Sequence, residues 1–233
     1  MTPKIGPIRT THPRLPARRG AGTGTWWSKA VLRAVEEAAF SAADLKAGRS
    51  LARSGAVGSI TVGDGHALAA VKDGHDAFTV EVTVPVLDDS DAAAFTELVA
   101  AESGRVAALL AGQLPHAFVE AVEEAGVELL PYGGELGSAC TCAAWLDPCP
   151  HALAVLTQLA WLIQADPFVL THLRGLSRDR VLRDLHRITT PYAEQSPAGA
   201  TSVPDEVDDL VVAEDAAVRA ARLLQQDQPF DAM

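Results

Sequence analysis

All three cysteines of the 233-residue chain lie within ten residues of one another, and a histidine follows the last of them. The pattern reads Cys140-Thr-Cys142, then six residues, then Cys149-Pro-His151. Three thiols and one imidazole make a complete ligand set for a tetrahedral ion such as Zn²⁺. Residues i and i+2 of an extended chain point to the same side, so Cys140 and Cys142 can face one ion. The sequence therefore predicts one structural zinc ion bound at this segment.

The prolines around the third cysteine support the same interpretation. Pro148 and Pro150 flank Cys149 and favour an extended backbone there. Because Pro150 suits the first position of a helix, a helix is predicted to begin at this residue. Cys149 and His151 would then lie at a helix N-terminus, where the helix dipole lowers a thiol pKa and favours the thiolate.

Structural zinc is favoured over three other chemistries for this cluster. A disulfide would leave one cysteine unpaired, and a cytoplasmic chain seldom keeps a disulfide. A catalytic pair of Cys149 and His151 is possible, but residues so close in sequence more often share a metal. An iron–sulfur cluster usually has four cysteine ligands. A filled Cys₃His site leaves no open position for hydrolysis, so we expect no enzyme and no small-molecule substrate.

Hydrophobic periodicity predicts an α+β fold. Residues 57–62, 67–72 and 78–86 are three segments separated by glycines, and apolar residues alternate with other residues along them. This pattern is typical of a three-stranded antiparallel meander. Helices are predicted from apolar spacing and capping residues at about 26–47, 91–110, 115–126, 150–165 and 176–188, with a short one after Asp166-Pro167. The predicted fold is a small antiparallel β meander with several helices and a compact zinc finger.

Composition along the chain divides it into four predicted segments. Residues 1–24, rich in Pro, Gly, Thr and Arg, are predicted to be a flexible basic arm. Residues 25–130 are predicted to form an α+β domain, and residues 131–190 the zinc finger and the helices that follow it. Residues 191–233 are predicted to be an acidic flexible tail.

No export or membrane signal is predicted. Arg18-Arg19 precede Trp26-Trp27, a pattern that invites a twin-arginine interpretation, but no apolar stretch follows. No segment reaches the roughly 18 consecutive apolar residues that a membrane-spanning helix needs. We therefore expect a cytoplasmic protein.

The net charge of −11 is distributed unevenly. Residues 1–59 carry ten basic and three acidic residues, whereas residues 60–170 carry two basic and sixteen acidic residues. A nucleic acid would require basic surface. The candidate residues for contact with a nucleic acid are Arg49, Arg53, Arg174, Arg178 and Arg187. The other explanation of these basic stretches is that they are ordinary solvated faces.

The C-x-C-x(n)-C-x-H spacing is the signature of the SWIM zinc finger, and the resemblance extends beyond the finger. The segments that resemble landmarks of the bacterial stand-alone SWIM proteins span about residues 25–187 and are Thr25-Trp26-Trp27, Ala47–Arg53, Leu110–Pro115, Cys140–His151, Asp166–Leu170 and Leu173-Arg174-Gly175. This resemblance implies zinc binding, a role in DNA or protein interaction and association with Swi/Snf-type DNA helicases. It implies no catalytic activity.

The finger departs from the family pattern C-x-C-P-D-W-x-x-P-C-K-H in a way that bears on function. Ala143 and Ala144 replace Pro-Asp, and Pro150 replaces the lysine, whereas Trp145 and Pro148 are kept. Losing the lysine weakens the case for phosphate contact at the finger. We therefore expect an interaction module, accessory to a Swi/Snf-type helicase through protein contact and with weak DNA contact. The alternative is a direct nucleic-acid-binding protein that uses the basic arm and the Arg174–Arg187 helix.

Overall fold

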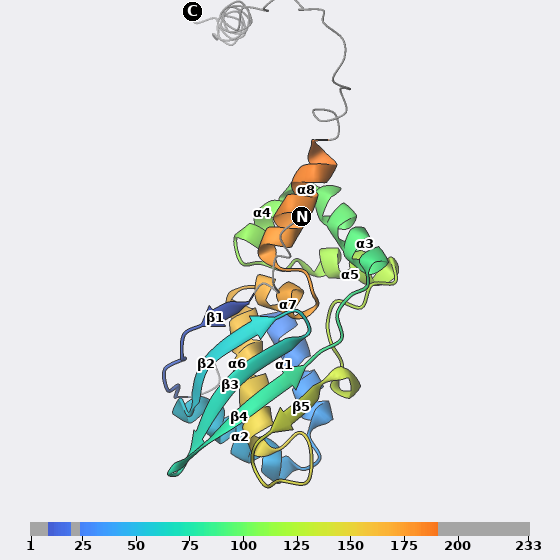
Figure 1. Cartoon of the computed structure of the whole chain (residues 1–233). Coiled ribbons are helices and arrows are strands. Elements are labelled where there is room, and N and C mark those ends of the chain that lie inside the picture. The colour runs from blue at the N-terminus through green and yellow to red at the C-terminus, as the bar shows by residue number, and fades with distance from the viewer. Residues whose placement is uncertain (1–8, 20–23, 191–233) are drawn as a thin grey trace, which may run out of the picture. The chain divides into compact units, whose positions relative to one another are not determined.

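The computed structural model describes residues 9–19 and 24–190, which combine an antiparallel sheet with helices (Figure 1). The sheet has five strands in the order β1-β2-β3-β4-β5. The strands are β1 (Thr10–His12), β2 (Val57–Gly63), β3 (His66–Asp73), β4 (Asp76–Thr83) and β5 (Gly137–Cys140). The α+β prediction is therefore confirmed, and the predicted three-stranded meander forms the middle of a wider sheet.

Alternation and glycine turns explain the β2–β3–β4 meander. Gly65 and Gly74 occupy its two turns with φ of +74° and +60°, backbone values that side chains with a Cβ rarely adopt. In β3, Ala67, Ala69 and Val71 are buried, whereas the residues between them are exposed. One face of the sheet is therefore part of the core.

Three helices lie on the side of that buried face, and one of them packs directly on the sheet (Figure 1). They are α1 (Trp26–Ala38), α2 (Ala42–Ser54) and α6 (Pro150–Ala165). Twelve residues of α6 are buried, because this helix packs on the sheet and is itself covered by α1 and α2. Nowhere in residues 9–19 and 24–190 is a helix both long and apolar enough to cross a membrane.

The predicted helix over residues 26–47 is in fact two helices. As expected, the Thr25 side chain caps α1 by accepting a hydrogen bond from the Ser28 backbone N–H. The helix ends at Ala38, however, and the Ser41 hydroxyl accepts from the Asp44 N–H at 3.0 Å to begin α2. A serine that caps a new N-terminus explains the break, since a side-chain cap favours a helix start at that point.

A second group contains the remaining helices. In the described part of the chain they are α3 (Asp89–Ala100), α4 (Ser103–Leu110), α5 (His116–Glu124), α7 (Phe168–Leu173) and α8 (Arg178–Thr189). A 3₁₀ turn at Gly133–Glu135 packs against α1 instead. The predicted helix up to Leu110 is thus divided between α3 and α4. The rings of Phe95 and Phe118 meet edge-on, with centroids 5.5 Å apart, and join α3 to α5.

Residues 9–19 correct the prediction of a flexible basic arm. Strand β1 pairs with β2, so that Thr10 faces Val62 and His12 faces Ile60. Further along, the Arg18 backbone N–H donates to the Arg53 carbonyl at 2.9 Å. The rest of the predicted arm and the whole predicted acidic tail, residues 1–8, 20–23 and 191–233, lie outside the described residues.

The predicted boundary between residues 25–130 and 131–190 does not separate two domains. Strand β5 pairs with β4, and α6 packs against β2, β3 and β4. Both segments belong to one compact unit. The residues of the predicted finger are therefore built into the main sheet and its helical layer.

Candidate metal centre

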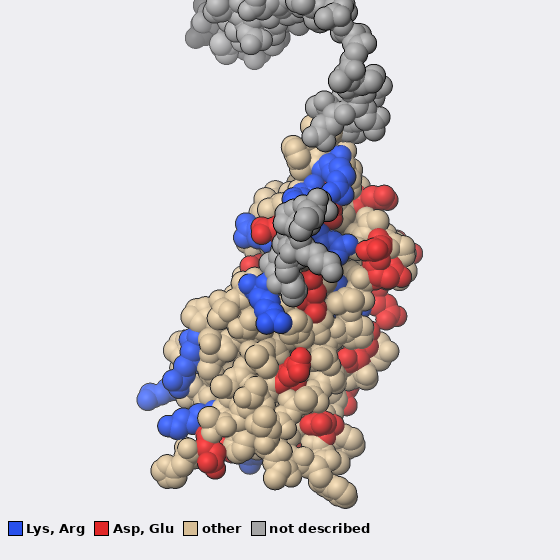
Figure 2. Space-filling view, viewed as in Figure 1, with Lys and Arg blue, Asp and Glu red and all other residues tan. Residues whose placement is uncertain are grey.

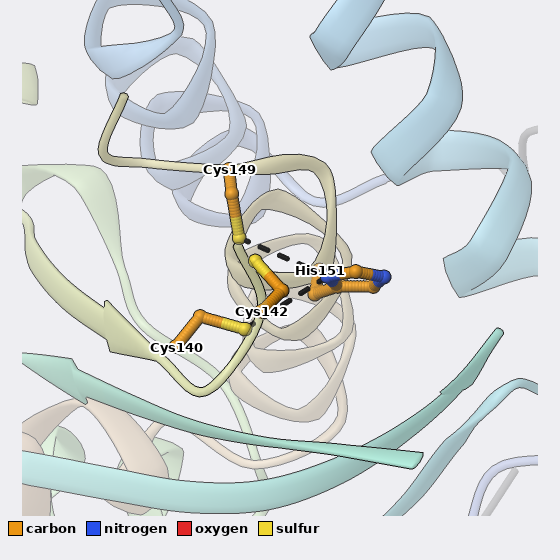
Figure 3. A group of neighbouring side chains, drawn as sticks. All are labelled: Cys140, Cys142, Cys149 and His151. Atoms are coloured by element: carbon orange, nitrogen blue, oxygen red, sulfur yellow. Dashed lines mark hydrogen bonds between the residues drawn. The ribbon is translucent and has the colours of Figure 1, made fainter. Parts of the chain in front are cut away.

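The four predicted ligands meet where β5 ends and α6 begins (Figure 3). Cys140 is the last residue of β5 and pairs with Val80, a buried residue of β4. Directly paired residues share a face of the sheet, so Cys140 lies on the side that α6 covers. Cys149 is the N-cap of α6, and His151 is in its first turn. The helix start at Pro150 is as predicted.

The side chains of the cluster point toward one another (Figure 3). The possible ligand atoms of Cys140, Cys142, Cys149 and His151 all lie within 4.8 Å of one another. His151 Nδ1 is 3.8 Å from the Cys140 sulfur and 4.0 Å from the Cys149 sulfur. Cys149 and His151 are buried, and the other two are half-buried. The structure thus brings all four together, and they could hold one metal ion.

Burial and hydrogen bonds shift the pKa values of the three thiols. Burial raises the pKa of Cys140 to about 12 and also raises the pKa of Cys149. Burial acts the same way on Cys142, but hydrogen bonds from the Ala144 backbone and from His151 outweigh it and lower its pKa to about 7. Neighbouring thiolates repel each other, so all three ionise together only when a cation lies between them.

Backbone contacts fix the chain as it leaves β5. The Thr141 N–H donates to the Thr79 carbonyl, and the Thr79 N–H donates to the Thr141 hydroxyl, both at 3.0 Å. These bonds prolong the pairing with β4 up to the residue before Cys142. The loop then exposes Trp145, which is 93% accessible to solvent, before the chain returns to Cys149.

His151 has contacts on its other ring edge and on its ring face. Its Nε2 lies 3.3 Å from Asp73 Oδ2, and the Phe78 ring stacks on it with centroids 4.4 Å apart at 26°. Both partners come from the β3–β4 hairpin and were missed in the sequence analysis. The only sequence signal for Asp73 is its place in the inward-facing alternation of β3, which does not by itself identify a partner.

Helix α2 holds the first turn of α6 in place through a glycine. A Cβ added at Gly48 would lie 2.6 Å from the Leu153 Cβ and 2.9 Å from the Pro150 carbonyl oxygen. Only a residue without a side chain allows the two helices to approach this closely. The position of Cys149 and His151 therefore depends on a contact with α2.

Arg174 was predicted to lie on an exposed helix, and the structure corrects this. Its side chain is buried, donates to the Pro85 carbonyl at 2.8 Å and to the Glu128 carbonyl, and approaches the Glu135 carboxylate at 3.6 Å. Arg174 caps the C-terminus of α7, and Gly175 with φ +86° separates it from α8. It joins segments of the fold and is not available to a nucleic acid.

The other four predicted nucleic-acid residues lie on two separate helices. On α2, Arg49 forms an ion pair with Glu36, and Arg53 lies in the last turn. On α8, the Arg187 guanidinium is 3.2 Å from Asp184, whereas the Arg178 guanidinium lies over the Phe168 ring at 5.2 Å. Helices α2 and α8 lie toward opposite ends of this unit (Figure 1), so the structure does not gather these residues.

Charge is unevenly spread over the visible surface (Figure 2). Acidic side chains are frequent on the side formed by α3, whereas basic side chains lie along the opposite edge and also around α8. Three arginines meet at the end of α2: the Arg14 side chain donates to the Gly55 carbonyl, and the Arg18 N–H donates to the Arg53 carbonyl. Basic residues are thus gathered at the end of α2.

Comparisons with known proteins show a distant relative. No protein-family model matches the chain, and no solved structure matches it. The chain is 30% identical over 169 residues to "Uncharacterized protein Rv2102" of Mycobacterium tuberculosis (strain ATCC 25618 / H37Rv). The match covers 72% of this chain and 61% of that protein. The chain is thus similar to an uncharacterised mycobacterial protein, and it spans about 61% of the length of that relative.

Proposed function

We propose that the chain is a zinc-binding interaction module of the SWIM type and that it has no catalytic activity. The observation that carries this proposal is the meeting of Cys140, Cys142, Cys149 and His151 at one point. Thiolates and an imidazole are the ligands that zinc prefers. Tetrahedral Zn²⁺, with Zn–S of about 2.3 Å and Zn–N of about 2.0 Å, would separate sulfur and nitrogen by roughly 3.5 Å. The distances of 3.8 and 4.0 Å are close to this value.

The zinc ion in this proposal has a structural role. Four protein ligands fill its coordination sphere, so no position stays open for a substrate or a reactive water. The ion ties the end of β5 to the start of α6 and closes the loop between Cys142 and Cys149. A loop that is fixed at both ends loses less entropy when it binds a partner.

The closed loop offers an apolar surface to a protein partner. Trp145 and Leu146 are both exposed, and the loop residues 143–148 carry no basic side chain and a single acidic one, Asp147. Exposed large apolar side chains often mark protein contacts, whereas phosphate recognition requires cations. The resemblance to stand-alone SWIM proteins supports a Swi/Snf-type helicase as the partner. The exposed tryptophan supports a direct protein contact at the loop.

Affinity capture with the full-length chain tests the partner. The wild type, Trp145→Ala and Phe40→Ala should be incubated with lysate of the source organism, and bound proteins identified by mass spectrometry. Phe40 is the matched control, since it is an exposed aromatic residue outside the loop. We expect the wild type and Phe40→Ala to retain a Swi/Snf-type helicase and Trp145→Ala to lose it. Absence of a helicase from the wild-type sample, or equal recovery with Trp145→Ala, would contradict the proposal.

Direct nucleic-acid binding is a second candidate, favoured by the basic residues at the end of α2. Arg14, Arg18 and Arg53 take part in none of the ion pairs found among the described residues. We expect only weak binding of DNA, with Kd of about 10⁻⁶ M or higher near physiological salt. Titration of labelled DNA at two salt concentrations, with the wild type and an Arg18→Gln, Arg53→Gln variant, tests this. Nanomolar binding that the variant loses would make nucleic-acid binding the primary function.

A further inference from the structure

The imidazole of His151 presents its two nitrogens to different partners. Nδ1 faces the sulfurs of Cys140 and Cys149, whereas Nε2 faces the carboxylate of Asp73 at 3.3 Å. In a neutral imidazole only one nitrogen carries hydrogen, and the hydrogen bond at one nitrogen decides which nitrogen is left to bind a metal. Nε2 is therefore placed to donate a hydrogen bond, and Nδ1 is placed to bind a metal.

We infer that Asp73 is a positioning residue of the metal centre, whose carboxylate accepts the Nε2 hydrogen of His151 and so fixes Nδ1 as the metal ligand. The inference rests on the proposed metal binding and extends it beyond the four ligands, to a hairpin that lies far from them in sequence. Histidine ligands in metal sites usually donate their second ring N–H to a carboxylate or a carbonyl, which also makes the ligating nitrogen more basic.

The sequence of β3 explains why a carboxylate lies at this place. Ala67, Ala69 and Val71 point to the buried face of the sheet, and Asp73 continues the same alternation at the last position of the strand. Gly74, with φ +60°, then turns the chain into β4, so the strand ends beside the first turn of α6. Alternation thus directs the Asp73 side chain toward α6.

Phe78 reinforces this arrangement from the neighbouring strand. It lies on the same face of β4 as the buried Val80, and its ring covers one face of the His151 imidazole. With its face stacked and Nε2 bonded, the imidazole keeps one free edge, and that edge faces the thiols. A half-turn of the ring would remove Nε2 from Asp73 and Nδ1 from the sulfurs at once.

The solvent exposure of the Asp73 and His151 side chains determines how much zinc affinity should be lost when Asp73 is replaced. The His151 side chain is only 10% exposed, but that of Asp73 is 55% exposed, so water weakens the interaction. Loss of such an outer partner typically lowers metal affinity 10- to 100-fold. For Asp73→Ala we expect a loss near the lower end, about tenfold. Asp73→Asn should lose less, because its amide oxygen can still accept the Nε2 hydrogen.

Zinc affinity of the full-length chain provides the first test. Competition with a chelating dye should be measured for the wild type, Asp73→Ala, Asp73→Asn and Asp76→Asn. Asp76 is the matched control, since it pairs with Asp73 in the same turn and has no contact with His151 among the described side-chain interactions. We expect the order wild type and Asp76→Asn, then Asp73→Asn, then Asp73→Ala, from tightest to weakest.

The protonation of His151 provides a second test that does not depend on the variants. In the zinc-loaded wild type labelled with ¹⁵N-histidine, a two-bond ¹H–¹⁵N correlation spectrum should show His151 protonated at Nε2 and metal-bound at Nδ1. Metal on Nε2, or an unchanged zinc affinity in Asp73→Ala, would overturn this inference alone. A wild-type chain that binds no zinc would overturn the proposed function and, with it, this inference.

Discussion

The buried Arg174 connects several segments of the fold through the hydrogen bonds and the ion pair of its side chain. The Arg174 guanidinium reaches the carbonyls of Pro85 and Glu128 and the carboxylate of Glu135, which come from three places along the chain. The Arg174 carbonyl in turn accepts from the Leu87 N–H at 2.9 Å. A buried charge is tolerated only when it is paired and hydrogen-bonded, and here both conditions are met.

Replacing this arginine should be costly. Arg174→Met keeps a long side chain but leaves the Pro85 and Glu128 carbonyls without the arginine donor and removes the charge that faces the shielded Glu135 carboxylate. We expect the free energy of unfolding to fall by about 3–5 kcal/mol, as for other broken buried pairs. The control Arg187→Met removes an exposed ion pair with Asp184 and should cost about 0.5 kcal/mol or less. Urea unfolding followed by circular dichroism measures both, and a variant as stable as wild type would refute the structural role.

At the scale of elements, the contact between α2 and α6 links the fold to the metal centre. Gly48 lets the α2 backbone lie against Pro150 and Leu153, in the first turns of α6. The same part of α6 carries Cys149 and His151. A disturbance of this helix contact is therefore expected to move two of the four ligands.

Gly48→Ala tests this link. The added Cβ would force the helices apart, and overpacking of this kind costs about 1–3 kcal/mol. We expect lower stability and weaker zinc binding together, measured by thermal unfolding and chelator competition. Gly104→Ala in α4 is the control, because a Cβ there meets nothing within 4 Å and should leave both properties nearly unchanged. Normal zinc affinity in Gly48→Ala would show that the centre does not depend on this contact.

Local patterns predicted some elements well. The bounds of α6 follow from Pro150 and an apolar run, the meander follows from alternation and glycine turns, and the proximity of the three cysteines and His151 follows from their spacing. Local patterns did not predict features that depend on contacts with residues far away in the sequence. Strand β1 is only three residues long and exists through its pairing with β2. Asp73 meets His151 across 78 positions, a contact that no local spacing reveals.

The predicted Arg174–Arg187 helix failed for a different reason. The helical spacing of Arg174, Arg178 and Arg187 suggested one exposed basic face. Gly175 adopts a left-handed backbone conformation between Arg174 and α8, so the first of these arginines belongs to another element. Arginine spacing alone does not show where a helix begins, whereas the Ser177 side chain that caps α8 does.

At the scale of the whole described unit, the candidate metal centre brings together three parts of the sequence. Cys140 ends β5, His151 lies in the first turn of α6, and Asp73 ends β3. Metal binding and local folding are coupled when ligands come from separate segments. The ion is therefore expected to stabilise one region of the unit more than the rest.

Chelation should reveal this region. When zinc is removed, amide hydrogen exchange should become faster in β5, in the first turn of α6 and at the β3–β4 turn. Exchange in α3 and α8 should stay nearly the same, since neither helix contributes to the centre. Mass spectrometry of exchanged peptides with and without chelator measures this. Equal protection across residues 130–165 in both states would mean that the ion does not hold this region together.

The central claim is that Cys140, Cys142, Cys149 and His151 bind zinc, and elemental analysis of the purified chain tests it most directly. The account predicts about one zinc ion per chain in the wild type. It also predicts a large loss of zinc in Cys142→Ser, because one of the four ligands is then missing. Iron in place of zinc, no metal at all, or a zinc content that is unchanged in Cys142→Ser would contradict it.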